Sequence, residues 1–349
     1  MGKVYLVIDL KTFFASVECV ARGLDPFTTN LVVADPSRGR GGVCLAITPA
    51  MKKLGIRNRC RIYEIPNNLK YITALPRMSK YIEYSANIYG IYLKYISKDD
   101  IYPYSIDECF LDVTPYLKIY KMNALEIAKV IMKDIFETYG ITATCGIGNN
   151  MYLAKVALDI LSKHSSTNIA WLNEEKYIKT LGEHKPLTDF WGIGKGIEAR
   201  LKKMGIFTIN DIAMCNKKIL YREFGANACF LIDHAKGIEP CTIADIKAYK
   251  PKTNSISNSQ ILFKDYNYED ARLVVKEMVE LLSQKLVEKN KKAGAIKLYI
   301  GYSKDVRKST GGSRKIKEAT NLYNKLSYEF ISLFEQTTDK NTPIRKIRH

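Results

Sequence analysis

The sequence lacks the residue spacings that hold a structural zinc ion or a disulfide framework. Its eight cysteines are scattered along 349 residues, no two of them form a Cys-x-x-Cys pair, and there are only four histidines. Zinc sites use closely spaced Cys and His ligands, and disulfide scaffolds are typical of short secreted chains. We therefore expect reduced, mostly buried thiols.

Long apolar runs are absent as well. No segment reaches the roughly 18 uncharged apolar residues that a membrane-spanning helix needs. The chain begins Met-Gly-Lys and continues directly into the strand-like run "KVYLVID", which is not the pattern of a secretory signal peptide. We expect no membrane partner and a cytoplasmic location.

Acidic residues are outnumbered by basic ones, with a formal net charge of +18. From Cys241 to His349 there are 22 Lys and Arg against 12 Asp and Glu, so an excess of 10 lies in the last third. Such a surface either keeps the protein in solution or attracts a polyanion through counterion release. Nucleic acid is the partner that this charge favours most.

The first half of the chain has the pattern of one mixed sheet backed by helices, interrupted by a small lobe. The lobe, at about residues 31–75, contains two strand-like runs, "LVVAD" and "IRNRCRIYEI", around a glycine-rich turn and the helix-like "TPAMKKLG". Thr12 and Asn123 are each placed to cap a following helix. "IYPYSI" and "CFLDV" read as the two strands of a hairpin.

The second half begins at about Pro186 with a helical texture and short loops. A polar stretch over residues 249–257 reads as a linker. Beyond it we expect a strand, a long helix, an alternating strand, a basic glycine-rich connection over residues 304–315 and a second long helix, which together form a split β-α-β unit. The closing strand would begin near Ile344, so it is either unusually short or cut off at His349.

Three acids stand where the pattern is otherwise apolar. Asp9 ends the first strand, and Asp107 and Glu108 are adjacent in the hairpin. Successive strand residues face opposite sides, so the pair can address one point only at a turn or bulge. Converging carboxylates would suit Mg²⁺, which prefers oxygen ligands. The alternative is a solvent-exposed acidic hairpin with Asp9 merely ending a strand.

Three segments in order, "VIDLKTFFASVE", "SIDECFLDV" and "GIGNNMYLAKVALD", resemble the palm motifs of the Y-family translesion DNA polymerases. "GIRNRCRIYEIP" and "SISNSQIL" are most similar to its bacterial UmuC-like branch, near the DinB-like enzymes. The resemblance covers essentially the whole chain and implies an α+β multidomain, right-hand polymerase fold. It implies a ferredoxin-like palm (1–12 and 80–170), small fingers (13–79), a helical thumb with a helix-hairpin-helix (171–240), a linker (241–254) and a split β-α-β little finger (255–349).

The resemblance also implies an activity and a metal site. The chain would be a low-fidelity, template-directed polymerase that adds dNTPs to a primer 3′-hydroxyl by two-metal-ion phosphoryl transfer and bypasses damaged template bases. Asp9 and Asp107 are similar to the carboxylates that bridge two Mg²⁺ ions, with Mn²⁺ as a substitute, and the carbonyl of Leu10 adds a ligand. Glu108 resembles the acid that holds the catalytic ion.

A nucleotide pocket follows from the same resemblance. Phe13 and Phe14 come directly after the first acid, and Phe14 occupies the position of the steric gate against a ribose 2′-hydroxyl. Lys52 and Lys163 match lysines that contact the triphosphate, although Lys163 stands one residue late and Pro49 replaces a tyrosine of some relatives. Solvated surface lysines are the alternative for both. The neighbouring Lys155 is closer to a structural role.

Two further features suggest contacts with DNA phosphates. "WGIGKGIEARLKKMGI" has the pattern of a helix-hairpin-helix, in which backbone amides at Gly192, Gly194, Lys195 and Gly196 would bind a phosphate without reading bases. Arg57, Arg59 and Arg61 alternate, so on a strand all three would face one side and form a basic ridge. An ordinary solvated edge strand is equally compatible with that alternation.

The expected partners are primer-template DNA and a dNTP, with the protein acting as a monomer. A sliding clamp could be bound through a tail beyond the present terminus. Two other functions remain open from the residues alone. A palm-type nucleotidyl cyclase would share the sheet and the carboxylates, and a non-catalytic DNA-binding scaffold would share the basic features.

Overall fold

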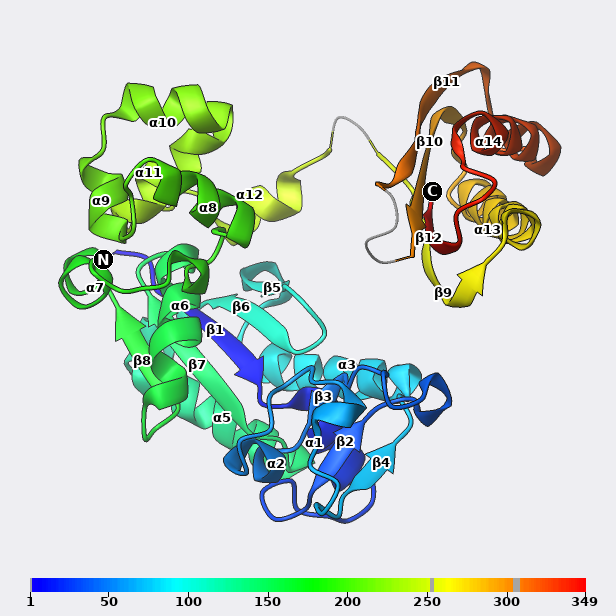
Figure 1. Ribbon diagram of the computed structural model, residues 1–349. Coiled ribbons are helices and arrows are strands. Elements are labelled where there is room, and N and C mark those ends of the chain that lie inside the picture. Colours follow the sequence, from blue (N-terminus) through cyan, green and yellow to red (C-terminus); the bar gives the residue numbers. More distant parts are fainter. Residues whose placement is uncertain (1, 252–253, 304–307) are drawn as a thin grey trace. The chain divides into compact units, whose positions relative to one another are not determined.

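The computed structural model describes residues 2–251, 254–303 and 308–349 (Figure 1). These form two compact units, residues 1–249 and 250–349. All eight cysteines are among the described residues, none of them is bridged in the structure, and five are buried, in agreement with the expectation of mostly buried thiols. In the described part of the chain no helix has the length and apolar character required to cross a bilayer.

A five-stranded sheet forms the centre of the first unit. Its order is β5-β6-β1-β7-β8, and all neighbours are antiparallel except β7 and β8. The central strand β1 is apolar on both faces because helices cover both of them. The strands are β1 (Tyr5–Leu10), β5 (Ile101–Pro103), β6 (Glu108–Asp112), β7 (Ala143–Gly148) and β8 (Ile169–Leu172).

The two faces of β1 pack against different elements. Leu6, Ile8 and Leu10 point into the core formed with α1 (Phe13–Val20), α3 (Met78–Tyr95) and α5 (Ala124–Tyr139). Tyr5 and Val7 point to the other face, which α6 (Met151–Val156) and the π-helical η4 (Ala157–Leu161) cover. Because side chains alternate along a strand, Asp9 lies on this second face.

Two glycines let α6 approach β7 closely. A Cβ atom at Gly146 would lie 2.0 Å from the carbonyl oxygen of Ala154, and one at Gly148 would lie 2.3 Å from the Ala154 nitrogen. No other residue type fits at either position without a shift of the backbone. The contact fixes α6 and η4 on the face of the sheet that carries Asp9.

The inserted lobe has three short strands instead of the two expected. They are β2 (Leu31–Val33), β3 (Ala46–Ile47) and β4 (Ile72–Ala74), in the order β3-β2-β4, with α2 (Pro49–Lys53) after β3. The expected strand over residues 56–65 is wrong. That stretch contains a 3-10 turn, η2 (Ile62–Glu64), and follows Gly55 at φ 81°, while Arg59 itself has φ 58°. A left-handed residue cannot continue a strand.

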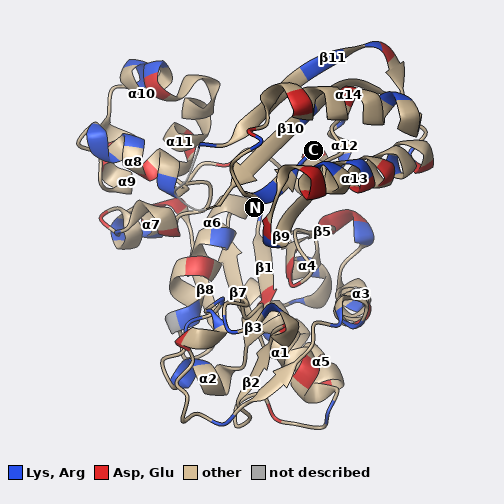
Figure 2. Ribbon diagram, turned by 45° about the vertical axis from the view of Figure 1, so that its right-hand side comes forward, with Lys and Arg blue, Asp and Glu red and all other residues tan. Residues whose placement is uncertain are grey.

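The helical texture expected after Pro186 is confirmed, and the packed helices share one buried core with α6 and β8. Figure 2 shows Lys and Arg along α8, whose last turn holds Arg200, Lys202 and Lys203. The helices are α7 (Glu174–Leu181), α8 (Lys195–Lys203), α9 (Ile209–Met214), α10 (Lys217–Phe224) and α11 (Ala228–Ala235). Shorter elements of the first unit are α4 (Tyr116–Tyr120), η1 (Pro36–Arg38), η3 (Lys98–Asp100), η5 (Ser162–His164), η6 (Leu187–Asp189) and η7 (Gly225–Asn227).

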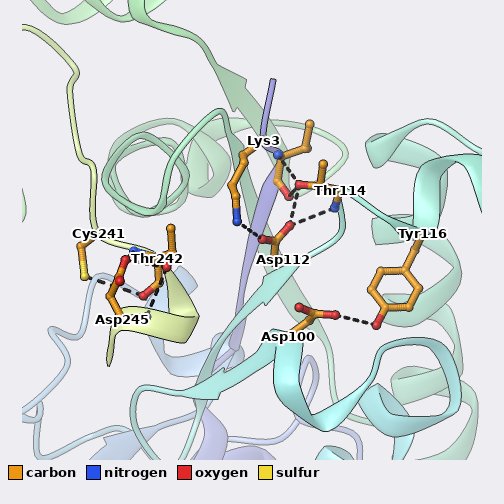
Figure 3. Close-up of polar contacts among 9 residues, drawn as sticks. Lys3, Asp100, Asp112, Thr114, Tyr116, Cys241, Thr242 and Asp245 are labelled. Carbon is orange, nitrogen blue, oxygen red and sulfur yellow. Dashed lines mark hydrogen bonds and ion pairs between the residues drawn. The ribbon is translucent and has the colours of Figure 1, made fainter. Parts of the chain in front are cut away.

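Residues 241–248, expected to be part of a linker, instead end in a helix, α12 (Ile243–Ala248). Thr242 and Asp245 form a reciprocal capping box at its start (Figure 3), which stabilises the first turn. Ile243 is buried against the second face of the central sheet. A helix forms here because residues 241–248 contain both a capping box and an apolar anchor, which the linker implied by the resemblance did not take into account.

The second unit is a four-stranded antiparallel sheet, in the order β11-β10-β12-β9, with two helices against one face. β11 occupies residues 310–320, so much of the expected connection is strand; residues 304–307 lie outside the described residues. The closing strand is present and has five residues. The elements are β9 (Ser259–Tyr266), α13 (Tyr268–Glu288), β10 (Ala293–Tyr302), β11 (Thr310–Thr320), α14 (Tyr323–Thr337) and β12 (Ile344–Arg348).

Candidate active site

The fold brings the three acids to one end of two neighbouring inner strands of the central sheet, where β1 ends and β6 begins. Asp9 and Glu108 are direct partners in the antiparallel pairing of β1 with β6. Directly opposed residues point to the same face with their Cβ atoms about 5 Å apart. Asp107 lies in the loop between β5 and β6, and its carbonyl oxygen accepts a 2.9 Å hydrogen bond from the Leu10 amide. The expected hairpin is therefore confirmed, with Asp107 in its loop and Glu108 opening the second strand.

The cluster is electrostatically strained. Burial, together with the neighbouring charges of Asp107 and Glu108, raises the pKa of Asp9 from 3.8 to about 7, although Lys163 and Lys155 oppose the change. Burial also raises the pKa of Glu108, and Lys155 opposes that rise. Carboxylates held together away from water favour a proton or a cation between them. The site therefore has a deficit of positive charge.

Lys155 supplies part of that charge. Its ammonium lies 2.8 Å from Oε1 of Glu108 and 2.9 Å from Oδ2 of Asp159, and its side chain is almost fully buried. Burial acts to lower the pKa of Lys155, but Asp159 and Glu108 outweigh it and the pKa is raised. The structural role expected of Lys155 is thus a bridge between α6 and β6. Asp159 was missed, although its i,i+4 spacing from Lys155 is a signal that the sequence carries.

The donor set fits a hard divalent cation, since the three carboxylates lie close enough to repel one another and carry excess negative charge. In the described ranges, however, no three His, Cys, Asp or Glu side chains are already arranged around a common metal position. The carboxylates have other partners: Glu108 pairs with Lys155, and Ser105 donates a 2.6 Å hydrogen bond to Asp107. Binding a cation would require these side chains to turn toward one another.

Several lysines surround Asp9. The expected pair, Lys52 on α2 and Lys163 in η5, comes together here. Loss of hydration lowers the pKa of Lys52 although the side chain remains open to solvent; repulsion by Lys163 and Lys11 adds to this, and Asp9 opposes it. Lys163 also lies 3.7 Å from Asp159. Lys11 was missed, although it stands only two residues after Asp9 in the sequence.

The two phenylalanines after β1 have different environments. Phe13 is 2% exposed and packs in the main core, which favours the structural role over the expected place in a substrate pocket. On a helix, adjacent side chains point about 100° apart, which allows Phe14 to remain partly exposed when Phe13 is buried. The ring of Phe14 stacks on Tyr81, with centroids 4.4 Å apart and an interplanar angle of 15°.

The glycine-rich turn lies at the start of α8. Gly192 has φ 91°, Gly194 is the N-cap residue, and Lys195 and Gly196 open the helix. A Cβ atom at Gly192, Gly194 or Gly196 would meet nothing within 4 Å, so the backbone of the turn is open on its outer side. Free amides at a helix N-terminus attract a phosphate.

The arginine ridge is not formed as expected, because its three residues do not lie on a strand. Arg57 pairs with Glu64 at 3.1 Å, and Arg61 donates a 2.7 Å hydrogen bond to the carbonyl of Gly41. Arg59 lies at the left-handed position between them. Alternate residues share a face on a strand but not in a turn, so the three arginines do not form a common basic face.

Comparison with known proteins identifies the class to which this fold and site belong. Residues 8–159 match the impB/mucB/samB family, and residues 253–348 match the C-terminal domain of the same family. The chain belongs to this family, which is a family of Y-family translesion DNA polymerases.

Individual relatives extend over most of the chain. It is 32% identical to "DNA polymerase IV 2" of Bacillus subtilis, over 99% of this chain and 83% of the relative. It is 30% identical to "DNA polymerase IV" of Shewanella loihica, over 80% of this chain and 75% of the relative. A solved Y-family DNA polymerase chimera of Dbh and Dpo4 superposes with a TM-score of 0.73 at 22% identity, covering 99% of this chain and 97% of its own. The expected α+β polymerase fold is confirmed.

Proposed function

We propose that this protein extends a primer 3′-hydroxyl with dNTPs on a damaged template, and that Asp9, Asp107 and Glu108 form its catalytic centre. The observation that supports this most strongly is the direct opposition of Asp9 and Glu108 across β1 and β6, with Asp107 in the adjoining loop. Membership of a polymerase family makes this end of the sheet the natural place for phosphoryl transfer.

The acids would hold two Mg²⁺ ions, or Mn²⁺ in their place, with the carbonyl of Leu10 as an additional ligand. When bound, such ions activate the hydroxyl nucleophile and stabilise the leaving pyrophosphate. The residues of this chain supply the negative charge that attracts the ions, and Lys155 holds Glu108 on the reacting face until they arrive. The raised pKa of Asp9 supports this role, because a divalent cation would relieve the same repulsion.

Lys52 and Lys163 would bind the triphosphate, since both lie close to Asp9 on elements that flank the acids. Phe14 would contact the sugar and exclude a 2′-hydroxyl by its bulk, because it is the partly exposed ring next to β1. An aromatic ring selects by clash and needs no hydrogen bond to do so.

Primer-template DNA would be held by the turn Gly192–Gly196 and by the basic second unit. We assign residues 1–12 and 80–170 to the palm, 13–79 to the fingers and 171–240 to the thumb. We assign residues 255–349 to the little finger, and the division of the chain into two compact units near residue 250 supports this assignment. We further propose that the protein works in the cytoplasm as a monomer and binds a sliding clamp.

The test is primer extension on an undamaged and an abasic template with Asp9→Ala, Asp107→Ala and Glu108→Ala. Each variant should lose incorporation by roughly 1000-fold or more, because losing metal-ion catalysis removes several kcal/mol of transition-state stabilisation. DNA binding, measured by fluorescence anisotropy, should change little.

The matched control is Asp112→Asn. Asp112 lies on the same strand and face as Glu108 but at the far end, where it accepts hydrogen bonds from Lys3 and Thr114 (Figure 3). This variant should retain extension. Near-normal extension by any of the three acid variants would refute the assignment. A cyclic nucleotide product would instead support a cyclase, and DNA retention without turnover would support a scaffold.

A further inference from the structure

Glu18 on α1 is a carboxylate with an unusual environment. Its side chain is fully buried, and it accepts two hydrogen bonds from Arg77, at 2.6 and 3.0 Å. Arg22, four residues further along the chain and just beyond the end of α1, also pairs with it. Burial alone would raise the pKa of Glu18, but the bonds from its partners lower it to about 2. Glu18 is therefore a fixed negative charge that ties α1 to the beginning of α3.

The same carboxylate fixes Tyr81. The Tyr81 hydroxyl donates a 2.7 Å hydrogen bond to Oε1 of Glu18, and Tyr81 is 0% exposed. Its ring stacks on Phe14 at 4.4 Å. Glu18 and Phe14 are four residues apart on α1, so the helix, the carboxylate, the tyrosine and the gate ring form a closed circuit of contacts.

This circuit of contacts restricts the movement of the Phe14 ring. A steric gate discriminates only if its ring cannot retreat, because a small displacement would make room for one hydroxyl group. Phe14 is only partly exposed, and its ring stacks on Tyr81, which is itself fully buried. Tyr81 in turn cannot slide without breaking a hydrogen bond to a buried charge, which is among the stronger kinds in proteins.

We propose that Glu18 and Tyr81 are positioning residues for sugar selection, which hold the Phe14 ring rigidly in place. Neither is expected to touch the nucleotide. This inference rests on the proposed role of Phe14 as the gate, and it names the part of the fold that makes the gate stiff.

The experiment measures kcat/KM for a dNTP and for the matching rNTP opposite the same template base. Tyr81→Phe removes only the hydroxyl and retains the stacked ring. It should lower the dNTP to rNTP ratio by about fivefold, equivalent to about 1 kcal/mol of differential transition-state binding. Glu18→Gln should lower the ratio at least as much. The reference is Phe14→Ala, in which the ratio should fall furthest.

The matched control is Tyr84→Phe, the same substitution one turn along α3, where the ring contacts Tyr139 and not Phe14. Its ratio should stay at the wild-type value. A merely structural role of Tyr81 and Glu18 would lower kcat/KM for the dNTP and the rNTP by the same factor and leave their ratio unchanged. That result would overturn the inference. Tyr81→Phe retains the ring volume and tests the idea even if Glu18→Gln fails to fold.

The outcomes separate the two proposals. If Phe14→Ala relaxes selection but Tyr81→Phe and Glu18→Gln do not, the gate assignment stands and the positioning role is wrong. If Phe14→Ala leaves the ratio unchanged, the gate assignment fails and the inference falls with it.

Discussion

Replacing Asp9 with asparagine should make the metal-free protein more stable at neutral pH. The substitution retains the shape of the side chain and removes the charge that Asp107, Glu108 and burial all disfavour. Without bound cations the three carboxylates repel one another, and the stability of the rest of the fold offsets this repulsion. Removing one charge should therefore increase the free energy of unfolding of the first unit.

The magnitude follows from the pKa. Asp9 has a pKa of about 7 in the folded protein against 3.8 for an unperturbed aspartate. The folded state thus binds this proton more tightly than the unfolded chain, and its stability falls as the pH rises from about 4 to about 7. Each pKa difference of one is worth about 1.4 kcal/mol, so the full effect is about 4 kcal/mol. The gain from Asp9→Asn should be near zero at low pH and complete above about pH 7.

Urea unfolding followed by tryptophan fluorescence measures this gain. Both tryptophans, Trp171 and Trp191, lie in the first unit, so the signal reports that unit alone. Wild type and variant are compared between about pH 5 and about pH 8 in a chelating buffer, where the difference should grow by about 1.4 kcal/mol per pH unit up to pH 7. Added Mg²⁺ should then stabilise the wild type more than the variant. A difference that does not change with pH, or a less stable variant at pH 8, would show that Asp9 carries no electrostatic strain.

Three further predictions concern the surroundings of the site. Lys155→Met should destabilise the first unit by about 3 kcal/mol or more in urea unfolding, because it leaves Glu108 buried without its partner. Adding Glu108→Gln should restore most of that loss. Purely additive effects of the two substitutions on the free energy of unfolding would contradict this prediction. Lys52→Ala and Lys163→Ala should each raise the KM for a dNTP about tenfold, equivalent to about 1.4 kcal/mol of binding, with a smaller effect on kcat in steady-state extension; an unchanged KM would remove that lysine from the triphosphate site. Gly146→Ala should lower stability by about 3 kcal/mol or more, because its Cβ would lie 2.0 Å from a backbone oxygen of α6, and a thermal midpoint equal to wild type would refute the close contact.

Much of the fold was visible in the sequence because it depends on local patterns. The apolar positions of α5, α13 and α14 recur at helical spacing, and each of these helices buries that face. The hairpin of Asp107 and Glu108 followed from two apolar runs around a short turn. These features depend on residues that are neighbours in the chain, so periodicity and turn chemistry were enough to predict them.

Other features depend on which residues meet across the fold, and local patterns do not contain that information. The opposition of Asp9 and Glu108 requires the register of two strands about 100 residues apart in sequence. Lys52, Lys155 and Lys163 reach Asp9 from separate elements, so their meeting there could not be read from local pattern. The predicted strand over residues 56–65 was wrong for a different reason. The alternation of arginines suggested a strand, but residues with positive φ angles form a turn there.

The strand order of the second unit has a consequence for how the protein is made. β12 lies between β10 and β9, and among the described residues β9 pairs with no other strand. Until residues 344–348 leave the ribosome, β9 therefore has no partner among the described strands, and its backbone hydrogen-bonding groups are open along both sides. Nascent chains and refolding intermediates should pass through an association-prone stage, and the yield of active protein should fall as the concentration during refolding rises.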